Sequence, residues 1–108
     1  MDGHERRATA EVDEVERKLR LGQHMELIPD LLQSVEAEPL RVRRWRELML
    51  ALYRCGRQID ALRTFQRCRL AILDESGLEP SVETLELERA ILLDRVELNW
   101  TGPDSIAY

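Results

Sequence analysis

Two glycines 34 residues apart, each between a pair of amphipathic segments, constrain the fold of this chain most strongly. On both sides of Gly22, and again on both sides of Gly56, apolar residues recur at the three- and four-residue spacing of one helix face. Glycine just past such a pattern commonly ends a helix, because it adopts the left-handed backbone at little cost. The sequence therefore predicts two successive helical hairpins and an all-α fold.

The composition favours helices over sheets. Five of the 108 residues are aromatic and five are glycine, whereas β-sandwiches and barrels rely on aromatic and β-branched strands with glycine-rich turns. The chain is 44% hydrophobic and 34% charged, which suits one modest core. It has no apolar run near the roughly 20 residues of a membrane span, and its first residues are charged rather than a signal peptide. We therefore expect a cytoplasmic helical domain.

Apolar residues at helical spacing predict five helices. Their expected positions are residues 8–19, 24–38, about 40–55, about 58–75 and about 82–97. Pro29 lies inside the second pattern, where it removes a backbone donor and crowds the preceding turn, so we expect a kink or a later start. Apolar residues of the fifth pattern spread over more than one stripe, which indicates contacts on two sides or with a partner. We expect residues 1–98 to form the domain and residues 99–108 an irregular tail.

Residues 42–75 carry a more detailed repeat pattern. It has large residues on the first helix, glycine at the turn, and small residues with one aromatic on the second helix: Trp45, Leu48, Gly56, Ala61, Phe65 and Cys68. This pattern and the 34-residue period are typical of tetratricopeptide repeats, and they predict Trp45 and Phe65 in the core. An earlier copy at residues 8–39 is degenerate, and a third is represented only by its first helix. We expect a short tetratricopeptide-like solenoid of antiparallel helix pairs.

No motif for catalysis or phosphate binding is present in the sequence. It lacks HExxH, GxSxG and GxxxxGK[ST], and its two histidines, His4 and His24, are isolated. Cys55 and Cys68 stand in apolar helical patterns without CxxC spacing, which favours buried free thiols over a disulfide or a metal site. We expect no enzyme activity, no catalytic residue, no metal and no cofactor.

Charge is divided unevenly along the chain, whose net charge is -5. Residues 40–69 contain nine arginines and two acids, whereas the segments on both sides are acidic. An arginine-rich stretch can neutralise nucleic-acid phosphates. Alternatively, the acidic segments neutralise the arginines within the fold, and the overall field repels a polyanion. We favour the second interpretation, and expect no direct nucleic-acid contact by this chain alone, no membrane binding and no small-molecule ligand.

Three short stretches carry a family resemblance. They are the turn Leu50-Ala51-Leu52-Tyr53-Arg54-Cys55-Gly56-Arg57, the helix start Ala61-Leu62 and the join Gly77-Leu78-Glu79-Pro80-Ser81. Residues 12–96 resemble the bacterial transcriptional activator domain, the helical region that follows a winged-helix DNA-binding domain in the Streptomyces antibiotic regulatory protein family. This sequence lacks the winged-helix domain and the first activator helices, so we expect a fragment or a module used alone, incomplete at its N-terminus. The resemblance implies an actinobacterial role in transcription regulation through self-association or contacts with the transcription machinery.

The concave side of such a solenoid is the expected partner site, since the first helices of successive repeats line a groove that can hold a peptide or a helix. The repeat register predicts these groove residues: Arg43, Arg46, Glu47, Met49, Tyr53 and Arg54. Arginines there would bind an acidic peptide or a carboxylate through paired hydrogen bonds. Alternatively, they pair with Glu14, Glu83 or Glu86 within the fold.

Three functions remain open from the sequence. One is a non-catalytic interaction module of a transcriptional regulator, the second is a generic tetratricopeptide scaffold that binds a peptide or partner helix outside transcription, and the third is direct nucleic-acid binding. Two and a half repeats are close to the minimum for a solenoid, because each end leaves an apolar face without a neighbour. We therefore expect a homodimer or a missing flanking segment.

Overall fold

The structure, a computed structural model, describes residues 14–102. Every regular element in that range is helical, which confirms the all-α fold class. The elements are a helical segment at residues 14–20, α2 (His24–Ala37), α3 (Val42–Arg54), α4 (Gln58–Ser76), α5 (Val82–Leu92) and the one-turn 3-10 helix η1 (Val96–Leu98). The earlier part of the first expected helix and the last residues of the expected tail lie outside the described residues.

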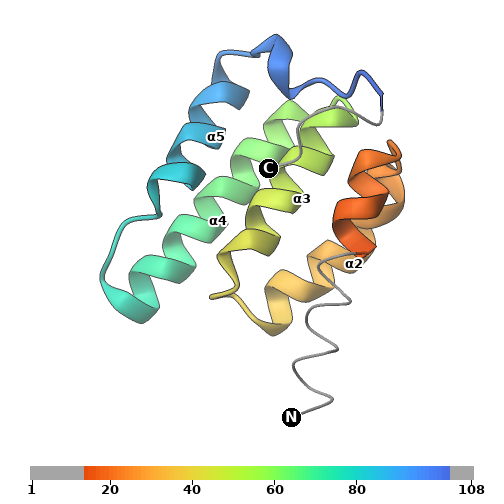
Figure 1. Ribbon diagram of the computed structural model, residues 1–108. Helices are drawn as coiled ribbons and strands as arrows, with labels where there is room; N and C mark the ends of the chain where they lie inside the picture. The colour runs from red at the N-terminus through yellow and green to blue at the C-terminus, as the bar shows by residue number, and fades with distance from the viewer. Residues whose placement is uncertain (1–13, 103–108) are drawn as a thin grey trace.

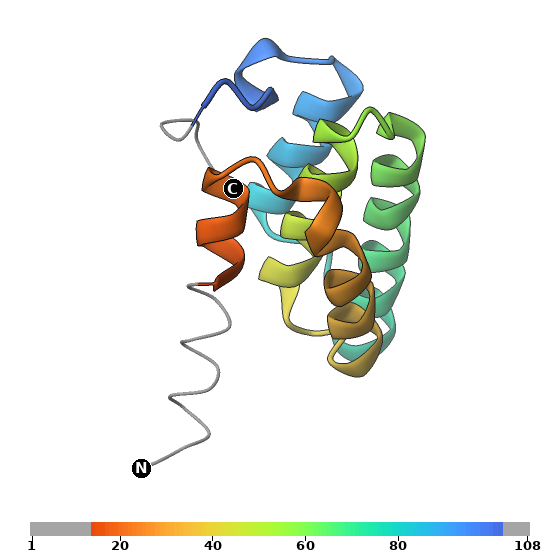
Figure 2. The ribbon, with the colours of Figure 1, turned by 90° about the vertical axis from the view of Figure 1, so that its right-hand side faces the viewer.

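Helices that follow one another in the sequence pack side by side, with α3 at the centre (Figure 1). α3 contacts α2, α4 and α5, and α5 also packs on α4. The helical segment 14–20 and α2 form a hairpin on one side of α3, while α4 and α5 lie beyond its other side (Figures 1 and 2). Because it is covered from several directions, α3 buries most of its side chains.

The same backbone turn follows the first helix of each hairpin, at Gly22 and at Gly56. Both glycines have a φ of +79°, in the left-handed region. In each turn, the amide of the next residue donates at 2.9 Å to the carbonyl five residues before it. This bond, together with the left-handed glycine, is the Schellman helix cap. The 34-residue repeat is therefore present in the backbone as well as in the sequence.

A third turn of the same kind follows α5, with Asp94 in place of glycine. Asp94 has a φ of +53°, and the amide of Arg95 donates at 3.1 Å to the carbonyl of Ala90, five residues before it. Aspartate enters the left-handed region more readily than most residues, since its short side chain hydrogen-bonds locally. α5 therefore ends at Leu92, and the prediction that it reaches about residue 97 is wrong.

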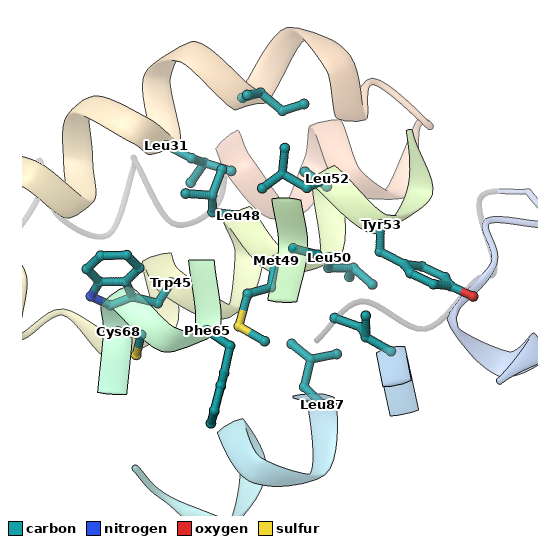
Figure 3. Packing of buried hydrophobic residues seen from close by; sticks show 14 of the residues in the cluster. Leu31, Trp45, Leu48, Met49, Leu50, Leu52, Tyr53, Phe65, Cys68 and Leu87 are labelled. Atoms are coloured by element: carbon teal, nitrogen blue, oxygen red, sulfur yellow. The ribbon is translucent and has the colours of Figure 1, made fainter. Parts of the chain in front are cut away.

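The predicted core residues Trp45 and Phe65 lie in the interior, with 3% and 4% of their surface exposed. Figure 3 shows them with Cys68 in the packing between α3 and α4, and Leu87 reaches the same interior from α5. The indole N–H of Trp45 donates to the carbonyl of Pro39 at 2.7 Å, which ties the start of α3 to the loop before it. The hairpin predicted over residues 42–75 is thus confirmed.

α2 begins at His24 although Pro29 lies inside it, so the predicted later start is wrong. Pro29 removes only the hydrogen bond that its amide would donate to the carbonyl of Met25. The buried side chains of Leu27 and Ile28 dock this part of the helix in the core. Burial of apolar surface on that scale outweighs the loss of one backbone bond.

Candidate interaction surfaces

Residues 94–100, called the C-terminal strap below, begin at the Asp94 turn and cross the end of the fold where the turns at Gly22 and Gly56 lie (Figures 1 and 2). We call that end the turn end. Leu98 of the strap has no exposed surface. Trp100 is 39% exposed, and its indole N–H donates to the carbonyl of Arg20 at 3.1 Å. The strap therefore connects the end of the described chain to the first hairpin.

Arg54 joins the middle of the strap to α2. Its Nε donates to the Leu98 carbonyl at 2.7 Å, and its Nη1 lies 3.2 Å from His24 Nε2. Burial lowers the pKa of His24 to about 4, and the charge of Arg54 adds to the effect. The imidazole is therefore neutral at neutral pH and able to accept a hydrogen bond from the guanidinium. Its ring meets Trp100 edge-on, with 6.2 Å between ring centroids.

Tyr53 holds the beginning of the strap. Its hydroxyl donates to Oδ1 of Asp94. Burial raises the pKa of Tyr53 to about 12, with the neighbouring carboxylate adding to the shift. The phenol therefore stays protonated over the physiological range and remains a donor to the Asp94 turn.

A charged cluster lies where the helical segment 14–20 meets α3, with Glu47 and Arg44 buried and Arg43 and Glu16 partly exposed. Glu47 has no exposed surface, and its Oε1 accepts a hydrogen bond from Arg44 Nη1 at 2.9 Å. Arg43 Nε lies 3.5 Å from Glu47 Oε2, and Arg43 also pairs with Glu16. Burial raises the pKa of Glu47, while the two arginines oppose the shift. Glu47 takes both cations from its own helix, as a buried carboxylate requires, and the Arg43–Glu16 pair connects α3 to the preceding hairpin.

The six predicted groove residues all lie on α3, but the structure does not line an open groove with them. Glu47 and Met49 have no exposed surface, so a groove-facing position is wrong for both. The reason is that α3 is the central helix and is covered by its neighbours on several sides. Arg43 has the most open position of the six, with 45% of its side chain exposed. Partner binding through Arg43 stays a prediction.

The other three predicted groove residues contact α5 and the strap. Arg46 donates to Oγ1 of Thr84 on α5 at 3.3 Å. Tyr53 and Arg54 make the strap contacts described above. The observed hydrogen bonds therefore use these side chains within the fold, but they go to Thr84, Asp94 and the Leu98 carbonyl rather than to the expected Glu14, Glu83 or Glu86.

A hollow of about 690 Å³ lies between the helical segment 14–20, α2 and the start of α3. Apolar residues Val15, Leu27 and Leu31 contribute to its lining. Its charged lining residues have both signs: Glu14, Lys18, Asp30, Glu38, Arg41 and Arg44. Mixed charge of this kind selects no single class of ligand.

α5 carries a smaller hollow of about 350 Å³. Its apolar lining consists of Val82, Leu85 and Leu92, with exposed fractions of 65%, 40% and 53%. Glu86, Glu88 and Arg89 complete the lining. This is the second apolar side expected of the fifth helix, and it is open to solvent. We call the row Val82, Leu85, Arg89 and Leu92 the α5 seam.

Among residues 14–102, no group of three or more His, Cys, Asp or Glu side chains is placed to hold a metal ion. No helix in the described part of the chain has the length and apolar character needed to cross a bilayer.

The sequence also matches a known protein family. Residues 2–92 match the sequence profile of the bacterial transcriptional activator domain. The chain belongs to this family. It is therefore a domain of the kind found in transcriptional regulators, as the resemblance noted from its sequence predicted.

Several Streptomyces regulators are similar to this activator domain. Regulatory protein DnrI of Streptomyces peucetius is 36% identical over 90 residues, which is 83% of this chain and 33% of DnrI. Regulatory protein AfsR of Streptomyces griseus is 40% identical over 80 residues, 74% of this chain and 8% of AfsR. Transcriptional regulator RedD of Streptomyces coelicolor is 41% identical over 76 residues, 70% of this chain and 22% of RedD. The chain thus spans a third or less of each relative, and no solved structure matches it.

The strap of this activator domain lies beyond the residues that match the family profile, which end at Leu92. Sequence reasoning missed its contacts, because it placed residues 94–97 in the fifth helix and residues 99–108 in an irregular tail. The available signal was a pair of large apolar residues, Leu98 and Trp100, in a segment that is otherwise polar except for Val96. Two apolar side chains at that spacing are candidates for anchors rather than for a solvated tail.

Proposed function

We propose that this chain is a non-catalytic protein–protein interaction module of a transcriptional regulator, and that it acts by self-association through the α5 seam. The observation that carries the proposal is the exposed apolar row on α5 formed by Val82, Leu85 and Leu92. The regulatory names of its relatives support transcription in the bacterial cytoplasm as the setting.

The α5 seam has the spacing of a coiled-coil contact. Its residues are successively three, four and three positions apart, so they form one row along the helix. Leu87 and Ile91, which pack into the core, lie on another side of α5. A second helix can therefore pack on the seam without disturbing the core.

The charges along the seam favour a second copy of the chain as the occupant. Arg89 stands in the row itself, and Glu86 and Glu88 flank it on opposite sides. In an antiparallel contact about a two-fold axis, Arg89 of one copy lies level with Leu85 of the other and next to that copy's Glu86. Each copy thus offers charges of both signs around a shared apolar row.

Other uses of the seam are less favoured. A contact with a component of the transcription machinery, or with a flanking helix of a longer protein, would use the apolar row but leaves the Arg89 and glutamate pattern unexplained. A scaffold outside transcription does not account for the regulatory relatives. The acidic flanks and the net charge of -5 oppose direct contact with nucleic acid.

A bacterial two-hybrid assay with this chain on both reporter halves tests the proposal. The wild type is expected to give a self-interaction signal, and the double variant Val82→Lys/Leu92→Lys is expected to lose it. Each new lysine gains a glutamate four residues away, Glu86 or Glu88, so α5 itself stays intact.

The matched control is Leu70→Lys on α4. Leu70 is 60% exposed, and its replacement gains Asp74 at the same four-residue spacing. This variant adds one lysine of the same kind away from the seam, so it should keep the signal. Absence of a signal for the wild type, or a signal that survives the double variant, would contradict self-association through the seam.

A further inference from the structure

The C-terminal strap contacts the turn end as a bound peptide contacts a receptor. Its contacts come from side chains and single backbone groups rather than from a helix or a strand pair, and its one regular element is the single turn η1. We propose that the turn end is a peptide-binding site that the strap occupies in this structure. Its ligand class is a short peptide with an acidic residue, a leucine four residues later and a tryptophan two residues after that.

Two apolar anchors fill the site. Leu98 is fully buried, and Trp100 lies against the backbone of the first turn, where Gly22 has no side chain to obstruct the ring. The carbonyl of Arg20 accepts the indole N–H, and His24 meets the ring edge-on. A buried aliphatic residue and an oriented indole are the features on which binding energy usually concentrates at an interface.

Polar groups of the second hairpin fix the direction of the peptide. Tyr53 donates to the carboxylate of Asp94, and Arg54 donates to the backbone carbonyl of Leu98. The bond from Arg54 goes to a backbone carbonyl, so it does not depend on the side chain at that peptide position. The Tyr53 hydroxyl contacts a side chain, so it favours a peptide with a hydrogen-bond acceptor there. The groups of the site come from both hairpins. The packing of the two hairpins therefore forms the site without a contribution from the peptide.

Leu98 belongs to the hydrophobic core, but its immediate neighbours in the strap lie at the surface. Glu97 and Asn99 are exposed on either side of buried Leu98, and Trp100 keeps 39% of its surface in solvent. The covalent link to α5 gives the strap a high effective concentration at the site. A peptide from a partner therefore binds only when the strap is weakened or outcompeted, which makes the strap an internal competitor.

This inference does not depend on the α5 seam. The seam residues lie on α5, whereas the site is formed by residues from the two hairpins and their turns. Loss of peptide binding would leave self-association unchanged, and a monomeric chain could still bind the peptide. Self-association and peptide binding can therefore be tested, and rejected, independently of each other.

The test uses a fluorescein-labelled synthetic peptide of residues 93–102 and the full 108-residue chain. Fluorescence anisotropy is expected to show saturable binding of the peptide to the Trp100→Ala chain, at least about tenfold tighter than to the wild type, whose own strap competes. A peptide carrying Trp100→Ala is expected to bind this chain at least about tenfold more weakly, because it lacks the aromatic anchor.

A second measurement needs no substitution in the chain. When unlabelled peptide is added to the ¹⁵N-labelled wild type, the indole N–H resonance of Trp100 should move toward its position in the free peptide, while that of buried Trp45 stays in place. No saturable binding to the Trp100→Ala chain, together with an unchanged Trp100 resonance at excess peptide, would overturn the proposal. Equal binding of the two peptides would also overturn it.

Discussion

A Cβ atom added to Gly22 would lie 2.9 Å from the indole ring of Trp100, although the two residues stand at opposite ends of the described chain. No real Cβ approaches another atom so closely without a shift. Gly56 occupies the equivalent place in the next repeat, with the same φ of +79° and nothing within 4 Å of an added Cβ. The two glycines thus share one backbone conformation but differ in their contact with the strap.

This pair makes a matched experiment. Gly56→Ala should lower the free energy of unfolding by about 1–2 kcal/mol, the cost of a left-handed alanine. Gly22→Ala should cost at least about 1 kcal/mol more, because it also displaces Trp100. Urea unfolding of both variants measures the difference, and the excess should vanish in a Trp100→Ala background. If Gly22→Ala and Gly56→Ala lowered the free energy of unfolding equally in the wild-type background, the contact between Gly22 and the Trp100 ring would not affect stability.

The hydrogen bond between Tyr53 and Asp94 has its own test. Tyr53→Phe should lower the free energy of unfolding by about 1 kcal/mol in the wild type, because it removes a donor to a carboxylate. In an Asp94→Gly background it should cost nothing, since glycine keeps the φ of +53° but has no acceptor. A double-mutant cycle from thermal or urea unfolding gives the coupling. If the losses of unfolding free energy from the two substitutions were additive, the Tyr53–Asp94 hydrogen bond would make no contribution to stability.

Burial of His24 makes stability depend on pH in a defined window. Its folded pKa is about 4, below the ordinary value of 6.5, so the unfolded chain binds more protons between these two values. The contribution of His24, up to about 3 kcal/mol, should be complete above pH 6.5 and should be lost as the pH falls toward 4. The His24→Gln variant should lack this slope, and NMR titration of the wild-type imidazole should show no protonation at pH 6. A normal imidazole pKa would exclude burial of the ring.

The buried carboxylate of Glu47 predicts a large mutational effect. Glu47→Gln should destabilise the chain by about 3–5 kcal/mol, because it removes the buried carboxylate that pairs with buried Arg44. Glu14→Gln is the control, since Glu14 pairs with Arg17 at the surface at 2.7 Å and should change unfolding little. Urea unfolding followed by circular dichroism measures both variants. A stability loss that is no larger for Glu47 than for Glu14 would mean that the internal cluster is not required.

The sequence predicted the parts of the fold that local patterns determine. Gly22 and Gly56 gave the turns, and the spacing of Trp45 and Phe65 gave the core of the second hairpin. The turn at Asp94 was missed because aspartate rarely replaces glycine in the left-handed region. The contact between Trp100 and Gly22 was missed because no local pattern relates residues so far apart in the chain.

Two of the six predicted groove residues, Glu47 and Met49, are buried for a related reason. If α3 is an amphipathic helix with one open side, its pattern predicts that Glu47 and Met49 face a partner. The run LMLALY at residues 48–53 is apolar on every side of a helix, and a helix of that kind is buried all round. Because α3 is buried on all sides, an open apolar surface has to lie on a neighbouring helix. The α5 seam is such a surface.

Sedimentation velocity of the purified chain across a wide concentration range tests self-association through the α5 seam most directly. The account predicts a monomer at low concentration that converts to a dimer as concentration rises, in the wild type and in Leu70→Lys. Val82→Lys/Leu92→Lys should remain a monomer with unchanged helical circular dichroism. A wild type that stays monomeric at the highest concentration, or a double variant that dimerises as the wild type does, would contradict it.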